Sequence, residues 1–251
     1  FEEIYKRKGR VRYVDFNQGI DSRLITDENM EKLAEIPVRP VRIAFDHWNL
    51  HQKYEKAVRT AVKHGHTSLS NYVLYNYRDT PLELYWRLKL NVDLCEELGV
   101  SIYSFPMKYH PITDPKYFSN RDYIGKNWNR KYIRTIQAIL NSTKGKVGKG
   151  KEFFEKAFGR NEAEFEKLLM MPEAMIIYRF YFEEIGLTDE WWKRYSALSE
   201  PQKELIKPII FSNKFDDYEN QIKDKKCLKV LSYYRVKRED AEEAMNRKNG
   251  L

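Results

Sequence analysis

The chain has 251 residues and a formal net charge of +8, and 42% of its residues are hydrophobic and 14% aromatic. This hydrophobic content excludes an intrinsically disordered chain, and the length suits one large domain or one domain with a helical appendage. No apolar run approaches the roughly 20 residues of a membrane helix, and the first residues do not resemble a signal peptide, so we expect a cytoplasmic protein without a membrane partner. The basic balance favours anionic partners but does not specify them.

Cysteine content limits the chemistry of the chain, which has only Cys95 and Cys227, in unrelated contexts. Two such residues form neither a zinc site nor a three-thiolate cluster site by themselves, and a domain of this size is not a disulfide scaffold. Cys95 lies in an amphipathic helical pattern, which predicts a buried core thiol. The chain opens with Phe1 rather than Met, so we expect the natural protein to begin earlier.

β-Prone and helical segments alternate over the first part of the chain, which is typical of a parallel sheet with crossover helices. Strands are expected at residues 11–16, 40–45, 71–75 and 100–105.

Helices are expected between these strands, and their ends carry recognisable signals. Thr26 precedes two acidic residues, as a helix cap does. The second helix is expected to stop at Gly65. The third begins with a capping box formed by Thr80 and Glu83, with a proline at the first helical position, and ends at Gly99.

The remainder of the chain is predicted to be mainly helical. Further helices are expected at 153–158, 163–171, 173–184, 189–198 and after a capping box formed by Ser199 and Gln202. The charged residues 239–251 are expected to fray. We therefore predict an α/β fold, with an incomplete parallel (β/α) barrel of about four strand–helix units over residues 1–112 and a mainly α-helical region over residues 113–251.

Polar residues follow each expected strand, at the point where the strand ends. The carboxyl ends of parallel strands meet at one edge, where the loops gather ligand-binding groups. Any single polar residue there is compatible with a helix cap or a solvated loop, but four successive polar loops predict a pocket. The residues are Asn17, Gln18, Gly19, Asp21, Arg23, Asp46, His47, Asn76, Arg78, Asp79, Lys108, Tyr109 and His110.

Four motifs, in this order and spacing, resemble a group of radical S-adenosylmethionine (radical SAM) proteins. They lie at residues 15–24 (DFNQGIDSRL), 40–46 (PVRIAFD), 72–81 (YVLYNYRDTP) and 105–109 (FPMKY), and the third continues into a helix that contains Arg87.

The resemblance implies a fold and a chemistry. Members of this superfamily resemble a partial TIM barrel in which a CxxxCxxC loop binds a [4Fe–4S] cluster, and the cluster holds S-adenosylmethionine. Reductive cleavage of this cofactor yields a 5′-deoxyadenosyl radical that takes a hydrogen atom from the substrate. The strands of this chain would be the later ones of the barrel, and the intact enzyme would need a reductant protein.

This chain departs from the family because it has no CxxxCxxC motif. We expect a fragment whose cluster-binding segment precedes Phe1, the alternative being a degenerate homologue. Such a fragment is expected to be inactive alone and to bind neither S-adenosylmethionine nor the [4Fe–4S] cluster tightly. The resemblance assigns no metal ligand or catalytic residue in this chain, and it does not identify the substrate.

The motif residues offer groups suited to the implied cofactor. Asn17, Gln18 and Asp21 have oxygens that accept hydrogen bonds from ribose hydroxyls. Arg23 supplies a cation for the carboxylate. Gly19 would let the backbone approach the ligand closely, although a simple turn explains it equally well.

Residues after the later strands are candidates for the remaining contacts. Asp46 and Asn76 are expected to contact the adenosine moiety or the substrate. Lys108 and Tyr109 lie where a substrate would enter, and a loop packed against the helical region is an equal interpretation.

A nucleic-acid-binding module is the first alternative. Basic and aromatic residues interleave over residues 116–134, and such residues neutralise phosphates and stack on bases. No RNA-binding motif accompanies them. This alternative is compatible with an enzyme that acts on RNA.

A metal-dependent hydrolase is the second alternative. His64 and His66 resemble a His-x-His ligand pair, with Asp15, Asp21 and Asp46 as candidate carboxylate ligands. The two histidines flank the end of an expected helix, which places them at the opposite edge of the sheet from the polar loops.

Overall fold

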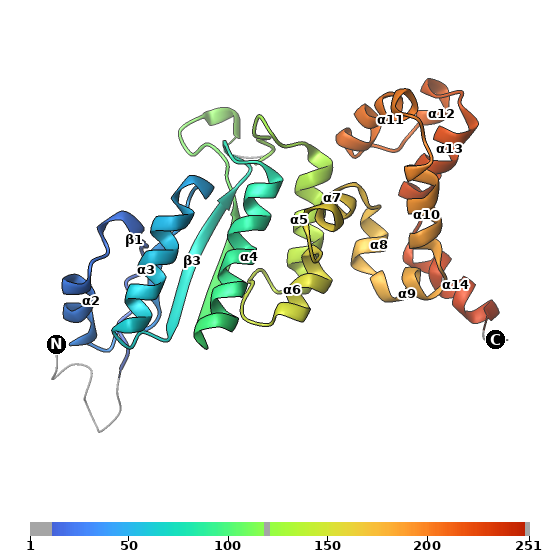
Figure 1. The fold of residues 1–251 in the computed structure, drawn as a ribbon. Coiled ribbons are helices and arrows are strands. Elements are labelled where there is room, and N and C mark those ends of the chain that lie inside the picture. Colours follow the sequence, from blue (N-terminus) through green and yellow to red (C-terminus); the bar gives the residue numbers. More distant parts are fainter. Residues whose placement is uncertain (1–11, 118–120, 249–251) are drawn as a thin grey trace. The chain divides into compact units, whose positions relative to one another are not determined.

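The computed structural model describes residues 12–117 and 121–248 (Figure 1). Their contacts divide the chain into two compact units. The first contains the described residues up to Asn127 together with Thr143–Glu162. The second contains Trp128–Ser142 together with the described residues from Ala163 onwards.

A parallel sheet forms the centre of the first unit. Its strands are β1 (Ile20–Asp21), β2 (Val41–Ala44), β3 (Ser68–Tyr75) and β4 (Ser101–Lys108), and their order in the sheet is β1-β2-β3-β4. Each strand pairs in parallel with the next. This sheet and the helical remainder confirm the predicted α/β fold, an incomplete parallel barrel followed by a mostly helical region.

Helices connect successive strands, and they are α2 (Asp27–Ala34), α3 (His51–Lys63) and α4 (Pro81–Leu98). Figure 1 draws β3 between two of these helices, α3 and α4. A shared core joins the three helices to the sheet and includes Met30 of α2 and Val58 of α3. Successive side chains of a strand point to opposite faces of the sheet, so the side chains of one face pack into this core.

The capping signals of these helices are confirmed. Thr80 Oγ1 accepts a hydrogen bond from the Glu83 amide at 3.2 Å, and the Glu83 carboxylate accepts one from the Thr80 amide at 2.7 Å. Gly99 ends α4 in the left-handed conformation, with φ of 65°. Thr26 caps α2 through a box with Asn29, and α3 ends before Gly65 as expected.

The prediction of the first strand was wrong. β1 lies at Ile20–Asp21, whereas Val14 forms only an isolated parallel bridge with Val38, and residue 11 lies outside the described residues. The reason is burial: Phe16 remains 44% exposed, whereas Ile20 packs against the core. Burial on the pleated surface, more than intrinsic β-propensity, decides which segment pairs.

The other strands differ from expectation only at their ends. β3 starts earlier than predicted, and β4 continues through Pro106 to Lys108. The fourth strand was predicted to end before Pro106. β4 continues through this proline because it is the last strand in the sheet order, and an edge strand tolerates a residue without a backbone N–H.

The remaining helices continue the α-helical region. They are α5 (Arg130–Ser142), α6 (Lys151–Phe158), α7 (Glu162–Met170), α8 (Glu173–Ile177), α9 (Arg179–Glu184), α10 (Leu187–Ser196), α11 (Glu200–Ser212), α12 (Tyr218–Gln221), α13 (Lys225–Ser232) and α14 (Arg238–Lys248). Short 3-10 helices lie at Ser22–Leu24, Trp48–Leu50, Pro115–Tyr117 and Tyr233–Arg235.

Two predictions in this region need correction. The expected helix over 173–184 is divided at Tyr178, whose φ of −109° and ψ of 41° are not helical. The charged end that was expected to fray forms α14 as far as Lys248, and residues 249–251 lie outside the described part. Ala241 of α14 is fully buried, which stabilises the helix beyond its own propensity. The capping box of Ser199 and Gln202 is confirmed.

Within the described residues, no helix combines the length and apolarity needed to cross a membrane.

Candidate functional site

The carboxyl edge of the sheet contains a small pocket of about 150 Å³. It lies between the loops that follow β2 and β3. Its lining residues are Asp46, His47, Leu74, Tyr77, Arg78 and Asp79. The segments that follow the strands leave the sheet at this edge because the four strands are parallel and adjacent.

Arg87 holds the loops around this pocket in place through hydrogen bonds to their backbone. Its side chain is fully buried on α4, and its guanidinium donates hydrogen bonds to the carbonyls of Phe45, Asp46 and Leu74 at 2.9–3.3 Å. It also forms an ion pair with the buried Asp79 at 2.9 Å. Burial lowers the pKa of Arg87, and the neighbouring carboxylates, Asp79 foremost, oppose this shift.

Sequence reasoning assigned Arg87 no role, although the helical pattern contained a signal. A charged residue on the buried face of an amphipathic helix requires partners that satisfy all its donors. Arg87 lies between the buried residues Leu84 and Leu88 of α4. The residue therefore belongs to the architecture of the pocket, where it positions Asp46 and Asp79.

Asp21 and Arg23 form a bidentate ion pair at the end of β1. Arg23 Nε lies 2.9 Å from Asp21 Oδ1, and Arg23 Nη2 lies 2.5 Å from Oδ2. The side chain and then the backbone N–H of Arg23 lower the pKa of Asp21 to about 2. Asp21 is therefore ionised at neutral pH and acts only as a hydrogen-bond acceptor.

Asp46 joins this pair electrostatically. Its charge contributes to the raised pKa of Arg23, after the larger contribution of Asp21. The Asp46 side chain is exposed and lines the pocket. Of the predicted cofactor-binding residues, Asp21 and Arg23 thus pair directly, and Asp46 follows the neighbouring strand β2, where Ala44 lies opposite Asp21.

The loop before β1 is held mainly by the sheet. Asn17 Oδ1 accepts a hydrogen bond from the Tyr72 hydroxyl at 3.2 Å, and Gln18 is exposed. A Cβ atom on Gly19 would lie 3.2 Å from the backbone nitrogen of Ala44. Close approach of this loop to β2 therefore accounts for the glycine.

Asn76 is fully buried and ties a neighbouring segment to the end of β3. Its Nδ2 donates to the carbonyls of Tyr109 and Tyr123 at 3.1 and 2.9 Å, and its Oδ1 accepts from the Gly125 amide at 2.9 Å. Asn76 adopts a left-handed conformation with φ of 68°. These bonds give the side chain a structural task at the position where a ligand contact was predicted.

We call residues 109–127, apart from 118–120, the strap. Asn127 Nδ2 donates to the Arg78 carbonyl at 2.9 Å, and Lys108 Nζ donates to the Arg121 carbonyl at 2.7 Å. A Cβ atom on Gly125 would lie 2.6 Å from the carbonyl oxygen of Tyr77, so only glycine fits there. The predicted substrate residues Lys108 and Tyr109 thus lie where β4 enters the strap.

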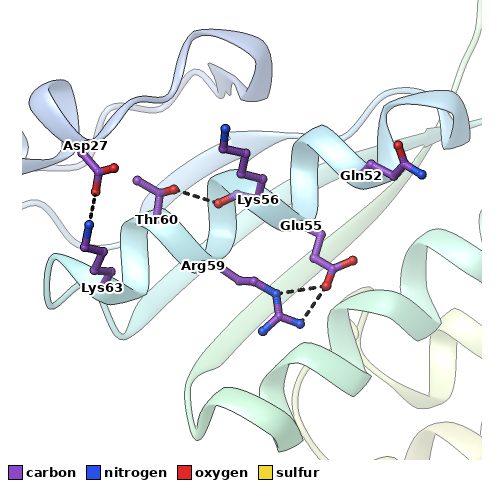
Figure 2. A pocket seen from close by; sticks show the side chains of 7 residues that line it. All are labelled: Asp27, Gln52, Glu55, Lys56, Arg59, Thr60 and Lys63. Carbon is purple, nitrogen blue, oxygen red and sulfur yellow. Dashed lines mark hydrogen bonds and ion pairs between the residues drawn. The ribbon is translucent and has the colours of Figure 1, made fainter.

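A second, larger hollow of about 400 Å³ lies on the outer surface of α3 (Figure 2). Its charged groups mostly pair with one another. Lys63 binds Asp27 at 2.7 Å, and Arg59 binds Glu55 at 2.7 Å. This shallow groove therefore has the character of a solvated helix surface, and the smaller pocket at the sheet edge is the better candidate site.

The histidines of the hydrolase alternative lie at the other edge of the sheet. His64 Nε2 lies 2.9 Å from Asp27 Oδ1, whereas Asp15 pairs with Arg42. His66 is buried before β3, and burial lowers its pKa. Within residues 12–117 and 121–248, no three His, Cys, Asp or Glu side chains are grouped to hold a metal ion.

Part of the basic and aromatic run over 116–134 is occupied in packing. Trp128 is 6% exposed, and Lys131 is fully buried. Tyr117 contacts Tyr123 edge to face, at 5.3 Å between ring centroids. Several rings and one cation of the run thus have protein partners instead of an open surface.

The two cysteines do not suit a [4Fe–4S] cluster. Cys95 is buried beneath β4, where its sulfur accepts a hydrogen bond from the Ile102 amide at 3.2 Å. Cys227 is buried in the second unit. Burial raises the pKa of both thiols, which disfavours the thiolate that binds iron.

Comparison of the chain with protein-family models, with curated proteins and with solved structures finds no match. The functional interpretation consequently rests on the motifs of the sequence and on the geometry of the pocket.

Proposed function

We propose that this chain supplies the later strand–helix units of a radical SAM enzyme, with the carboxyl edge of β1–β4 turned towards the cofactor and the substrate. The observation that supports this most is the coincidence of motif and geometry. Four parallel strands follow one another in sequence order, and the Asp21–Arg23 pair and Asp46 of the family-like motifs lie at the ends of the neighbouring strands β1 and β2.

The residues of this edge suit S-adenosylmethionine but not the cluster. When bound, this cofactor supplies the 5′-deoxyadenosyl radical that takes a hydrogen atom from a substrate. Asp21 and Asp46 offer carboxylate oxygens to ribose hydroxyls, and Arg87 holds the loop of Asp46 in place. The cluster and the reductant protein would act through a cysteine loop that this chain lacks, so the chain alone is expected to be inactive.

The reading frame that precedes the codon of Phe1 tests this proposal. We expect the frame to continue upstream and to encode earlier strand–helix units with a CxxxCxxC motif. The natural sequence of the gene decides the question. A start codon immediately before Phe1 would contradict the radical mechanism.

Replacing Asp21 with alanine is expected to weaken binding of S-adenosylmethionine to the complete, cluster-loaded protein by about tenfold, because a charged hydrogen-bond acceptor is lost. Isothermal titration calorimetry measures the dissociation constant. Asp27→Ala is the matched control, since Asp27 is also a carboxylate that pairs with a basic side chain but lies in the groove on α3. Equal affinity in Asp21→Ala and the unaltered protein would remove Asp21 from the site.

A further inference from the structure

Four tyrosines form a continuous run of ring contacts that starts at the pocket. The ring centroids of Tyr77 and Tyr109 are 4.4 Å apart, those of Tyr109 and Tyr123 are 5.5 Å apart, and those of Tyr123 and Tyr117 are 5.3 Å apart. Tyr77 lines the pocket. Tyr117 ends the 3-10 helix of the strap, beside the exposed Lys116. The run therefore leads from the pocket to the surface of the strap.

The hydrogen bonds of Asn76 hold this geometry. Asn76 binds the backbone carbonyls of two of the four residues, Tyr109 and Tyr123. Cations lie at both ends of the run, with Arg78 5.2 Å from the ring centroid of Tyr77 and Lys116 5.2 Å from that of Tyr117. The rings are thus held by a buried side chain and by cation–π contacts.

Packing alone does not require four phenols. Phenylalanine would give the same ring contacts, whereas each tyrosine adds an O–H group that is open to one-electron oxidation. All four residues are half-buried, so each side chain is partly accessible to solvent. Burial and the neighbouring tyrosines raise the pKa of Tyr123, so its phenol remains protonated at neutral pH.

We propose that Tyr77, Tyr109, Tyr123 and Tyr117 form a relay that carries an oxidising equivalent from the pocket to the surface and so discharges stray organic radicals. The source of the radicals rests on the proposed function, but the relay itself does not.

Each step of the relay moves one electron and one proton. A carbon-centred radical takes the hydrogen atom of Tyr77, so that a C–H bond forms, the O–H bond breaks, and a phenoxyl radical remains on Tyr77. Tyr109 then reduces this radical and becomes a phenoxyl radical itself, and Tyr123 and Tyr117 repeat the step. A soluble thiol finally gives a hydrogen atom to Tyr117, which restores the phenol and leaves a thiyl radical in solution.

A photo-oxidant attached at the pocket tests the relay in the full chain without cofactor. A ruthenium polypyridyl label on His47→Cys would lie at the pocket, and the two native cysteines are buried. After a flash, an added soluble electron acceptor oxidises the Ru(II) label to Ru(III). The Ru(III) label then takes one electron from Tyr77, which releases its phenolic proton, and mass spectrometry maps the oxidised tyrosines. We expect Tyr117 to be oxidised several-fold more than Tyr103, a half-buried tyrosine of β4 outside the run.

Phenylalanine variants identify the route. Tyr123→Phe and Tyr109→Phe each keep a ring but lack the phenol, and each should lower oxidation of Tyr117 to the level of Tyr103. Tyr103→Phe should leave oxidation of Tyr117 unchanged. Equal oxidation of Tyr117 with and without the phenols of Tyr109 and Tyr123 would overturn the relay. Because no S-adenosylmethionine or cluster is used, this result is independent of the reading-frame test of the proposed function.

Discussion

Replacing Arg87 with alanine is expected to lower the free energy of unfolding of the first unit by about 3–5 kcal/mol, the usual cost of breaking a buried ion pair. The substitution leaves the Asp79 carboxylate buried without its cation. It also removes the donors to the carbonyls of Phe45, Asp46 and Leu74. Urea unfolding of the full chain, followed by circular dichroism, measures the change.

Two further variants separate the buried pair from a general effect of losing an arginine. Arg59→Ala removes an exposed arginine that pairs with Glu55 and Glu97, and we expect a several-fold smaller change. Adding Asp79→Ala to Arg87→Ala should restore part of the stability, because no unpaired carboxylate then stays buried. Similar losses in Arg87→Ala and Arg59→Ala would show that Arg87 does not hold the pocket as described.

The stability of the second unit is expected to rise between pH 7 and pH 9 because of Lys131. The Lys131 Nζ donates to Thr135 Oγ1 at 2.7 Å and to the Met171 carbonyl at 2.5 Å. Burial lowers its pKa from 10.5 to about 7, the nearby Arg134 adds to this, and Glu173 opposes it.

The sign of this effect follows from proton binding. The unfolded pKa of Lys131 exceeds its folded pKa, so the unfolded state binds more protons between pH 7 and pH 10.5. Stability therefore increases with pH in this window, by about 2 kcal/mol from pH 7 to pH 9. Urea unfolding of the full chain at several pH values measures this slope.

The Lys131→Met variant isolates the contribution of this lysine. This variant has no titrating amine at the buried position. The rise in its free energy of unfolding from pH 7 to pH 9 should therefore be smaller than that of the unaltered chain by about 2 kcal/mol. Lys207→Met is the matched control, since Lys207 is a lysine of the same unit that pairs with Glu204 at the surface. The same pH dependence of the free energy of unfolding in Lys131→Met and in the unaltered chain would show that the pKa of the Lys131 amine is not lowered by folding.

Local signals in the sequence predicted the parts of the fold that depend on local interactions. The start and end of α4 follow from Thr80, Glu83 and Gly99, because caps and glycine stops act within one helical turn. The strands β2, β3 and β4 overlap their predicted ranges because these segments are rich in β-branched and aromatic residues.

The first strand depends on long-range contacts, and the sequence did not reveal them. Residues 13–16 have high β-propensity, but the core receives Ile20 instead. Tertiary burial overrode propensity at this position. The helical pattern over 173–184 is continuous and gave no sign of the break at Tyr178.

The candidate site was only partly predictable. Polar residues after parallel strands indicated the edge at which the pocket lies, and Asp46 lines this pocket while Asp21 and Arg23 pair at the end of the neighbouring strand. The roles of Arg87 and Asn76 depend on carbonyl groups distant in sequence, and carbonyl positions have no signature in residue type. Whether the predicted residues bind a cofactor stays a prediction.

The order of the strands has a consequence for how the sheet assembles. Each strand is hydrogen-bonded to the one that precedes or follows it in the chain, with one helical crossover between them. The sheet can therefore grow by addition of one unit at a time, and each new pairing closes only a short loop. Such a sheet can form progressively as the chain leaves the ribosome, and gain or loss of a unit at either end leaves the pairing of the others unchanged.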